Sequence, residues 1–136
     1  MDKTKLIEEL KRDEGVELRP YKCSAGFLTL GVGRNIQERG ITMDESDYLL
    51  ANDIKICEEE ASKVFKWFPS LTDDRQRAII NMVFNLGLTK LLHFKNFLAA
   101  MEAGDYETAG KEMLDSKWAR QVGNRSDRLE QMIVNG

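Results

Sequence analysis

The stretch VELRPYKCSAGFLTLGVG, residues 16–33, decides the fold class because its pattern differs from the helical spacing of the surrounding sequence. Its first part carries Val16, Leu18 and Tyr21, and its last part is the apolar run that begins at Phe27. Between them lies the short segment CSAG, whose small residues and glycine are typical of a turn between two strands. The pattern therefore predicts one β-hairpin over these residues.

Most of the remaining chain shows apolar residues at the three- and four-residue spacing of amphipathic helices. Glu14 and Gly15 are expected to end the first helix, and Thr42 with Glu45 forms a capping-box pattern at the start of the longest one. The longest helix is expected to end before Pro69, because proline breaks the helical hydrogen-bond pattern. The expected helices cover residues 3–12, 42–68, 73–86, 95–103, 105–115 and 124–134.

One hairpin among several helices predicts an α+β, mostly helical chain. Residues 34–41 are polar and contain a glycine, so we expect a loop there. We expect a single domain with two lobes, in which residues 13–60 carry the hairpin, residues 1–12 plus 61–136 form the helical lobe, and the long helix connects them. A cleft between two such lobes is a common place for a ligand.

The composition excludes several classes of function. The chain has 136 residues, of which 42% are hydrophobic, and this argues against disorder. Its net charge of −3 argues against a dedicated nucleic-acid binder. No apolar run approaches the ~18 residues of a membrane span, and the charged N-terminus lacks the pattern of a signal peptide. Cys23, Cys57 and the lone His93 are not spaced as metal ligands, and we expect Cys57 to be a small core residue.

Three residues near the hairpin have side chains suited to cleaving a glycosidic bond. Glu14 stands at the expected end of the first helix, Cys23 at the end of the first strand and Thr29 inside the second strand. Such cleavage needs a proton donor at the leaving oxygen and a positioned water or nucleophile on the opposite face of the sugar. From spacing alone the alternatives stay open: a solvated glutamate, a buried thiol and an ordinary strand threonine.

The sequence resembles the phage-type lysozymes over nearly the whole chain. The resemblance is carried by DEG at 13–15, PYKC at 20–23, GFLTLGVGRN at 26–35, GIT at 40–42, RAIINMVFNLG at 77–87, SKW at 116–118 and QVGNR at 121–125. The signature of this family is Glu, eight residues, Asp or Cys, five residues and Thr. It falls on Glu14, Cys23 and Thr29.

The resemblance implies a lysozyme-like two-lobed fold and hydrolysis, with inversion, of the β-1,4 bond between N-acetylmuramic acid and N-acetylglucosamine in bacterial peptidoglycan. It implies that Glu14 is the general acid that protonates the leaving oxygen, and that Thr29 holds the attacking water. For Cys23, which stands where the family has Asp or Cys, we expect help in positioning water or in stabilising positive charge rather than a covalent intermediate. We expect little thiolate at this position, because a nearby Glu14 carboxylate disfavours a second negative charge.

The resemblance also implies substrate contacts at Asn35, at the cleft-lining Phe84, and at Arg125, which matches an arginine that pairs with the catalytic glutamate across the lobes. Phe84 and Trp118 can also be interpreted as core aromatics. No cofactor is expected, and the expected partner is peptidoglycan, bound by a monomer that inserts into no membrane and binds no nucleic acid. The resemblance further implies synthesis in the cytoplasm of an infected bacterium and release through a holin-type pore, followed by host cell lysis.

Three alternative functions stay open at this point. A lytic transglycosylase would cleave the same bond without water, although Thr29 favours hydrolysis. An inactive peptidoglycan-binding module is disfavoured because Glu14, Thr29 and the segment at 81–87 occur together. A helical regulatory or adaptor protein would not explain the glycine-rich hairpin.

Overall fold

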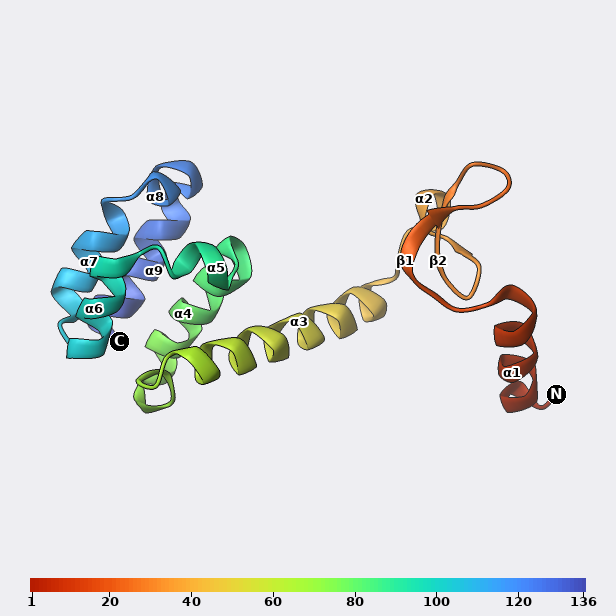
Figure 1. Ribbon diagram of the computed structural model, residues 1–136, viewed down its shortest axis with the longest axis horizontal. Helices are drawn as coiled ribbons and strands as arrows, with labels where there is room; N and C mark the ends of the chain where they lie inside the picture. Colours follow the sequence, from red (N-terminus) through yellow and green to blue (C-terminus); the bar gives the residue numbers. More distant parts are fainter. The chain divides into compact units, whose positions relative to one another are not determined.

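The computed structural model describes residues 1–136, and it contains nine α-helices, one short 3₁₀-helix and three strands (Figure 1). The chain is α+β and mostly helical, as the sequence predicts. It divides into two compact units, Met1–Tyr48 and Leu49–Gly136. The expected grouping of residues 1–12 with the helical lobe stays a prediction. None of the helices combines the length with the hydropathy that a membrane crossing requires.

The N-terminal unit consists of α1 (Lys3–Glu14), β1 (Glu17–Lys22), β2 (Leu28–Gly31), β3 (Arg34–Asn35) and α2 (Ile36–Arg39), followed by the start of the longest helix. Its strands form an antiparallel sheet in the order β1-β2-β3. Strands β1 and β2 are the predicted hairpin, in which Tyr21 pairs with Thr29. Thr29 also lies opposite Asn35 on β3. The register of the hairpin shifts between Glu17 and Tyr21, a segment that contains Pro20.

Helix α1 places Glu14 at its C-terminal end. The helix begins after Asp2, whose side chain accepts a hydrogen bond from the Lys5 backbone amide at 3.1 Å. It ends at Gly15, which has a φ of +77°. The predicted helix over residues 3–12 is confirmed and extends to Glu14. The glutamate therefore stands at the junction between this helix and the first strand.

The predicted loop over residues 34–41 is wrong, because β3 and α2 lie within it. Asn35 is the N-cap of α2, and its side-chain oxygen accepts a hydrogen bond from the Glu38 backbone amide at 3.1 Å. Gly40 ends α2 with a φ of +65°, a conformation that favours glycine. A strand of two residues and a helix of four are too short to leave a periodic pattern in the sequence.

The longest helix, α3 (Met43–Val64), begins with the predicted capping box. The Glu45 amide donates a hydrogen bond to the Thr42 hydroxyl at 3.2 Å, and the Glu45 carboxylate accepts one from the Thr42 amide at 2.8 Å. These two reciprocal bonds satisfy amides at the start of the helix that have no partner within it.

Helix α3 ends at Val64, which is earlier than the expected end just before Pro69. The 3₁₀-helix η1 (Phe68–Ser70) follows, with the proline in its first turn, where a missing amide hydrogen is tolerated. The rings of Phe65 and Trp67 stack with their centroids 4.8 Å apart in the segment between the two helices. Phe65 itself is buried in the core.

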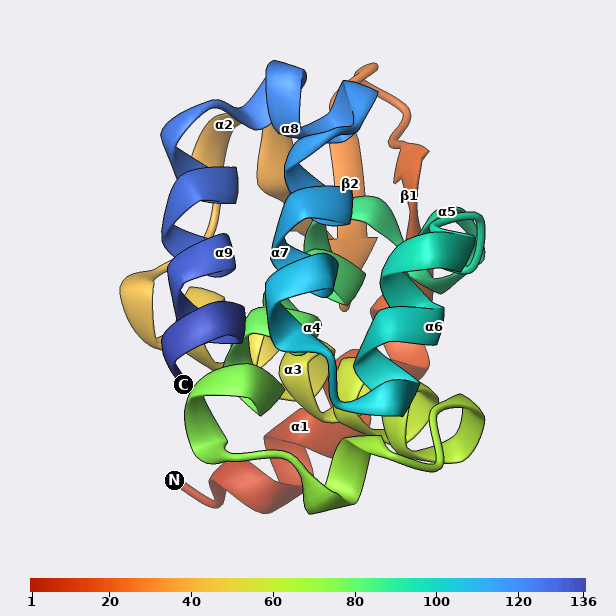
Figure 2. The same ribbon diagram turned by 90° about the vertical axis from the view of Figure 1, so that its left-hand side faces the viewer.

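The C-terminal unit is a group of helices around one hydrophobic core. Its remaining helices are α4 (Asp73–Leu86), α5 (Leu88–Leu91), α6 (Lys95–Ala103), α7 (Tyr106–Leu114), α8 (Lys117–Val122) and α9 (Asn124–Asn135). Figure 2 shows α6, α7 and α9 side by side. The large, fully buried side chains of the core are Phe97, Ile79, Met82, Leu91, Met101, Met113 and Ile133. Cys57 belongs to this core, as the sequence predicts.

Four of the helices in this unit are confirmed predictions, namely α4, α6, α7 and α9. The short helices α5 and α8 were not expected. They have four and six residues, and neither is long enough to repeat an apolar stripe.

Helices α7 and α9 approach each other closely at Gly110, which is buried within α7. A Cβ atom on Gly110 would lie 2.7 Å from Val134 Cγ2 and 3.1 Å from Glu130 Oε1. This glycine is therefore required for space, because its backbone is helical and has no positive φ. The C-terminal helix packs directly against the backbone of α7 at this point.

We expect Gly110→Ala to lower the free energy of unfolding by about 1 kcal/mol. Overpacking typically lowers stability by ~1–3 kcal/mol, whereas the higher helix propensity of alanine relative to glycine raises it by up to ~1 kcal/mol. Urea unfolding of the wild type, Gly110→Ala, Val134→Ala and the double variant measures the effect. The double variant should lose less than the sum of the single variants, since Val134→Ala removes the contacting methyl group. A Gly110→Ala protein as stable as the wild type would contradict this account of the α7–α9 contact.

Candidate active site

The carbonyl oxygen of Phe27 connects two of the residues that the sequence predicts to be catalytic. It accepts a hydrogen bond from the Cys23 backbone amide at 2.9 Å and another from the Thr29 hydroxyl, also at 2.9 Å. Thr29 itself is only 3% exposed. Since its one hydroxyl proton is directed to Phe27, the remaining lone pairs of the Thr29 oxygen are acceptors. The structure therefore brings Cys23 and Thr29 together at the turn end of the hairpin.

The Cys23 side chain is half-buried in the turn between β1 and β2. Hydrogen bonds from the backbone amides of Phe27 and Ala25 lower the pKa of the Cys23 thiol. Partial burial opposes this lowering without cancelling it. This direction is opposite to the one expected from a nearby Glu14 carboxylate. The turn thus favours the thiolate, because its amides donate to the charged form of the sulfur.

Glu14 is exposed at the end of α1, and its side chain lies against the turn between β2 and β3. A Cβ atom on Gly33, which belongs to this turn, would stand 2.9 Å from Glu14 Oε2 and 3.3 Å from Glu14 Cδ. The neighbouring carboxylate of Asp13 instead forms an ion pair with Arg12, at 3.1 Å from Nε to Oδ1. The two adjacent acidic residues therefore have different surroundings.

Asn35 lies next to Thr29 across the sheet, because the two residues pair in the register of β2 and β3. Side chains of directly opposed residues lie on the same face of a sheet. The side-chain oxygen of Asn35 accepts a hydrogen bond from the Glu38 amide, which orients the side chain and leaves its NH₂ group to donate to a sugar. A substrate contact at Asn35 stays a prediction.

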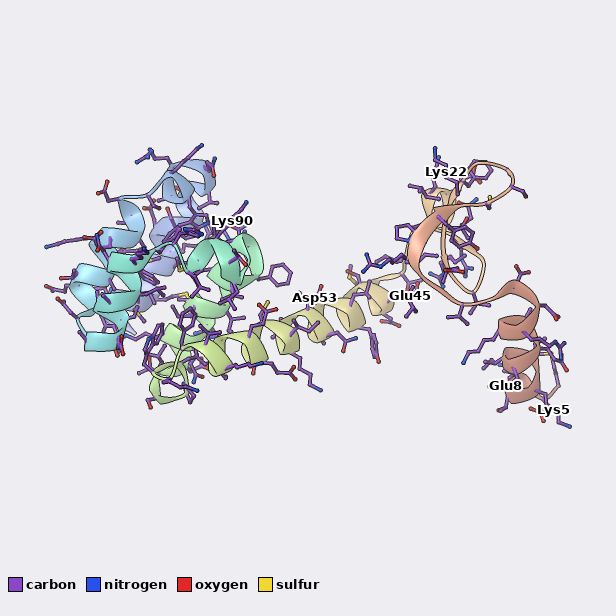
Figure 3. The ribbon with its side chains drawn as sticks, viewed as in Figure 1. Lys5, Glu8, Lys22, Glu45, Asp53 and Lys90 are labelled. Atoms are coloured by element: carbon purple, nitrogen blue, oxygen red, sulfur yellow. The ribbon has the colours of Figure 1, made fainter.

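An ion pair that the sequence analysis missed connects β3 to the start of α3. Nη1 of Arg34 lies 2.6 Å from the carboxylate oxygens of Glu45, which Figure 3 labels near the N-terminal end of α3. The hydrogen bond from Arg34, together with that from the Thr42 amide, lowers the pKa of Glu45 to about 2. The capping box pointed to Glu45, but no pattern in the sequence pointed to its second partner.

The C-terminal unit brings Phe84 and Arg125 to one open cavity of about 780 Å³. Arg125 donates two hydrogen bonds to Asn81 Oδ1, from Nε at 2.9 Å and from Nη2 at 2.7 Å. Phe84 is 47% exposed, so the interpretation as a core aromatic is wrong for this residue. It is right for Trp118, which is buried and donates from Nε1 to Asn85 at 2.7 Å. The expected pairing of Arg125 with the catalytic glutamate stays a prediction.

A carboxylate at a helix end, beside a hairpin that carries a hydroxyl and a thiol in a mostly helical α+β chain, suits the lysozyme class of proteins, in which a carboxyl group protonates the leaving oxygen. Comparison with known proteins leads to the same class, because residues 11–132 match the family described as Phage lysozyme. The chain belongs to the phage lysozyme family.

Individual relatives agree with this assignment. The chain is 32% identical to a protein named Probable T4-type lysozyme 1 from Dictyostelium discoideum, over 93% of this chain and 92% of that protein. It is 33% identical to an endolysin of Acyrthosiphon pisum secondary endosymbiont phage 1, over 82% of this chain and 75% of the endolysin. It is 30% identical to an endolysin of Salmonella phage P22, over 71% of this chain and 76% of the endolysin.

The ion pair at Glu45 predicts a specific dependence of stability on pH. The pKa of Glu45 falls from 4.5 to about 2 on folding, so the pair stabilises the protein fully above about pH 4.5 and is lost as the pH falls toward 2. Glu45→Gln should therefore melt at a lower temperature than the wild type near neutral pH, and the difference should shrink through that acidic window. The matched control is Glu38→Gln, an exposed glutamate on α2, for which we expect no such change. A Glu45→Gln difference that stays constant from neutral pH to pH 2 would show that the carboxylate charge contributes nothing.

Proposed function

We propose that this protein hydrolyses, with inversion, the β-1,4 bond between N-acetylmuramic acid and N-acetylglucosamine in bacterial peptidoglycan. As a member of the phage lysozyme family it is a glycoside hydrolase of the lysozyme type, and its substrate is peptidoglycan. The bond that is cleaved and the inversion of configuration go beyond what family membership gives. The observation that carries this part is the hydrogen bond from the Thr29 hydroxyl to the Phe27 carbonyl, next to Cys23.

Glu14 is the general acid in this proposal. Its carboxyl group protonates the glycosidic oxygen as the bond to the sugar breaks, so that the leaving sugar departs as a neutral alcohol. The exposure of Glu14 at the end of α1 supports this role, because a long polysaccharide needs access to the acid.

Thr29 positions the attacking water. Its own hydroxyl proton is bonded to Phe27, so the Thr29 oxygen accepts an O–H of the water. A water that donates in this way keeps a lone pair free to attack the sugar carbon, and the proton that it loses as the new C–O bond forms passes to the surrounding solvent. In an inverting enzyme the water attacks from the face opposite the leaving group. This requires a separation of about 6.5–9.5 Å between the two catalytic groups. We expect the Glu14 carboxyl and the Cys23 sulfur to meet this separation.

Cys23 stabilises positive charge on the sugar ring and does not form a covalent bond to it. The amides of Phe27 and Ala25 favour the thiolate, which supports a negative charge near the ring in the oxocarbenium-like transition state. The same hydrogen bonds lower the nucleophilicity of the sulfur, because nucleophilicity falls as the pKa of a thiol falls. A stabilising role follows more directly from this environment than a nucleophilic one.

A lytic transglycosylase is the second candidate, since it would use the same acid on the same bond. The Thr29 hydroxyl favours hydrolysis, because a transglycosylase needs no positioned water. Mass spectrometry of peptidoglycan digests separates the two functions: hydrolysis leaves a reducing sugar, and transglycosylation leaves an anhydro sugar lighter by one water. An unchanged digest would indicate a binding module without activity.

We also propose synthesis in the cytoplasm of an infected bacterium and release to the wall through a holin-type pore. The two phage endolysins among the relatives support this route. We propose a monomer that needs no cofactor.

We expect Glu14→Gln to lose lytic activity by at least about 10²–10⁴-fold, the usual contribution of general acid catalysis, because glutamine cannot donate the proton. The melting temperature should change little, since Glu14 is exposed. Activity is measured as loss of turbidity of permeabilised cells, and stability by thermal melting of the same preparation. The matched control is Asp13→Asn, which removes the adjacent carboxylate and the same charge, and it should stay active. Lysis by Glu14→Gln at a near wild-type rate would remove Glu14 from the mechanism.

Substitutions of Cys23 distinguish charge stabilisation from covalent catalysis. Cys23→Asp should stay active, since aspartate keeps a negative charge in a similar space, and Cys23→Ala should be slower without being inactive. The activity of the wild type relative to Cys23→Asp should rise with pH as the thiol ionises, because its lowered pKa brings that ionisation toward neutral pH. These rates are measured on the same cells across neutral and mildly alkaline pH. A covalent sugar adduct on Cys23 in the intact-protein mass would overturn the stabilising role.

A further inference from the structure

Gly33 is the residue on which the Glu14 side chain rests. A Cβ atom at this position would lie 2.9 Å from Oε2, 3.3 Å from Cδ and 3.6 Å from Cβ of Glu14. The side chain of Glu14 thus runs along the bare Cα of Gly33 from its first carbon to its carboxylate.

The close approach is specific to Gly33 among the glycines that adopt a positive φ. Seven others have a positive φ, at positions 15, 26, 31, 40, 87, 104 and 123, and an added Cβ would meet nothing within 4 Å at any of them. Their backbone conformation alone accounts for glycine. Gly33 has a φ of +63° as well, but it also needs the space that Glu14 occupies.

The turn that contains Gly33 is fixed on its far side. Arg34 follows directly, pairs with Leu30 across β2 and β3, and bonds to Glu45 at 2.6 Å. A side chain added at Gly33 is therefore accommodated by moving the flexible carboxylate of Glu14, and not by moving the strand.

We infer that Gly33 is a positioning residue for Glu14: its missing side chain sets where the carboxylate stands. This inference rests on the proposed function of Glu14 as the general acid. Gly33 has no side chain of its own to contribute to the reaction, and it takes no part in proton transfer. Its effect is on the placement of the acid relative to the glycosidic oxygen, and a misplacement of about 1 Å can cost on the order of 10²-fold in rate.

The experiment compares Gly33→Ala with Gly31→Ala. Gly31 lies two residues away, has a φ of +69°, and an added Cβ there meets nothing within 4 Å. Both variants place alanine at a positive φ, so they share the backbone cost, and only Gly33→Ala displaces Glu14. With soluble peptidoglycan fragments, kcat of Gly33→Ala should be about 10- to 100-fold below that of Gly31→Ala, with a similar KM.

A second measurement, by NMR, detects the contact between Gly33 and Glu14 independently of activity. In protein labelled with ¹³C, the carboxyl resonance of Glu14, identified by its absence in Glu14→Gln, should shift in Gly33→Ala and stay in place in Gly31→Ala. A resonance that is unchanged in Gly33→Ala, or equal kcat values for the two alanine variants, would overturn the inference. If Gly33→Ala fails to fold, Gly33→Asn replaces it, because asparagine tolerates positive φ and still carries a Cβ.

The two measurements separate this inference from the proposed function. A Glu14→Gln protein that stays active contradicts the general acid, whereas the resonance still reports whether Gly33 sets the position of the carboxylate. A shifted resonance with unchanged kcat would show that the contact exists and that it does not position a catalytic group, which overturns the inference.

Discussion

The carbonyl oxygen of Phe27 receives both the Cys23 amide and the Thr29 hydroxyl, and the candidate site depends on this double acceptance. The first bond closes the turn and keeps the Cys23 sulfur among the amides that favour its thiolate. The second bond fixes the Thr29 hydroxyl as an acceptor. Because Thr29 is buried in the middle strand, opposite Tyr21 and Asn35, the register of a three-stranded sheet determines which atoms are available for chemistry.

A second chain of contacts leads from the other end of β2 to the longest helix. The turn at Gly33 meets Glu14, the next residue, Arg34, bonds to Glu45, and Glu45 caps α3 together with Thr42. One carboxylate thereby satisfies a guanidinium and a helix start at the same time. The placement of the proposed acid is linked to the beginning of α3 through these few residues.

The sequence predicts the parts of this protein that repeat a pattern over many residues. The hairpin and helices α1, α4, α6, α7 and α9 follow from apolar spacing, and the glycines at 15, 104 and 123 mark where three of these elements end or begin. Strand β3 and helices α2, α5 and α8 were missed, since elements of two to six residues carry no period. The early end of α3 leaves no signal in the local sequence, where the first helix breaker after Val64 is Pro69.

The same distinction applies to the candidate site, where the sequence predicts some of the residues and not the atoms that support them. Spacing and family resemblance identified Glu14, Cys23 and Thr29, which are marked by residue type. The supporting atoms were not identifiable in this way. Three such features can be recognised only once the strand register is known. They are the backbone carbonyl of Phe27, the missing side chain of Gly33 and the pairing of Arg34 with Glu45.

Strand β1 also has a consequence for association between chains. It stands at the edge of the sheet, where unpaired backbone groups can recruit a strand from another molecule. Its register is interrupted between Glu17 and Tyr21, and Pro20 in that segment has no amide hydrogen to offer. An incoming strand would therefore meet a gap in the hydrogen-bonding ladder. The shifted register and the proline thus disfavour edge-to-edge association of this unit when the protein is concentrated.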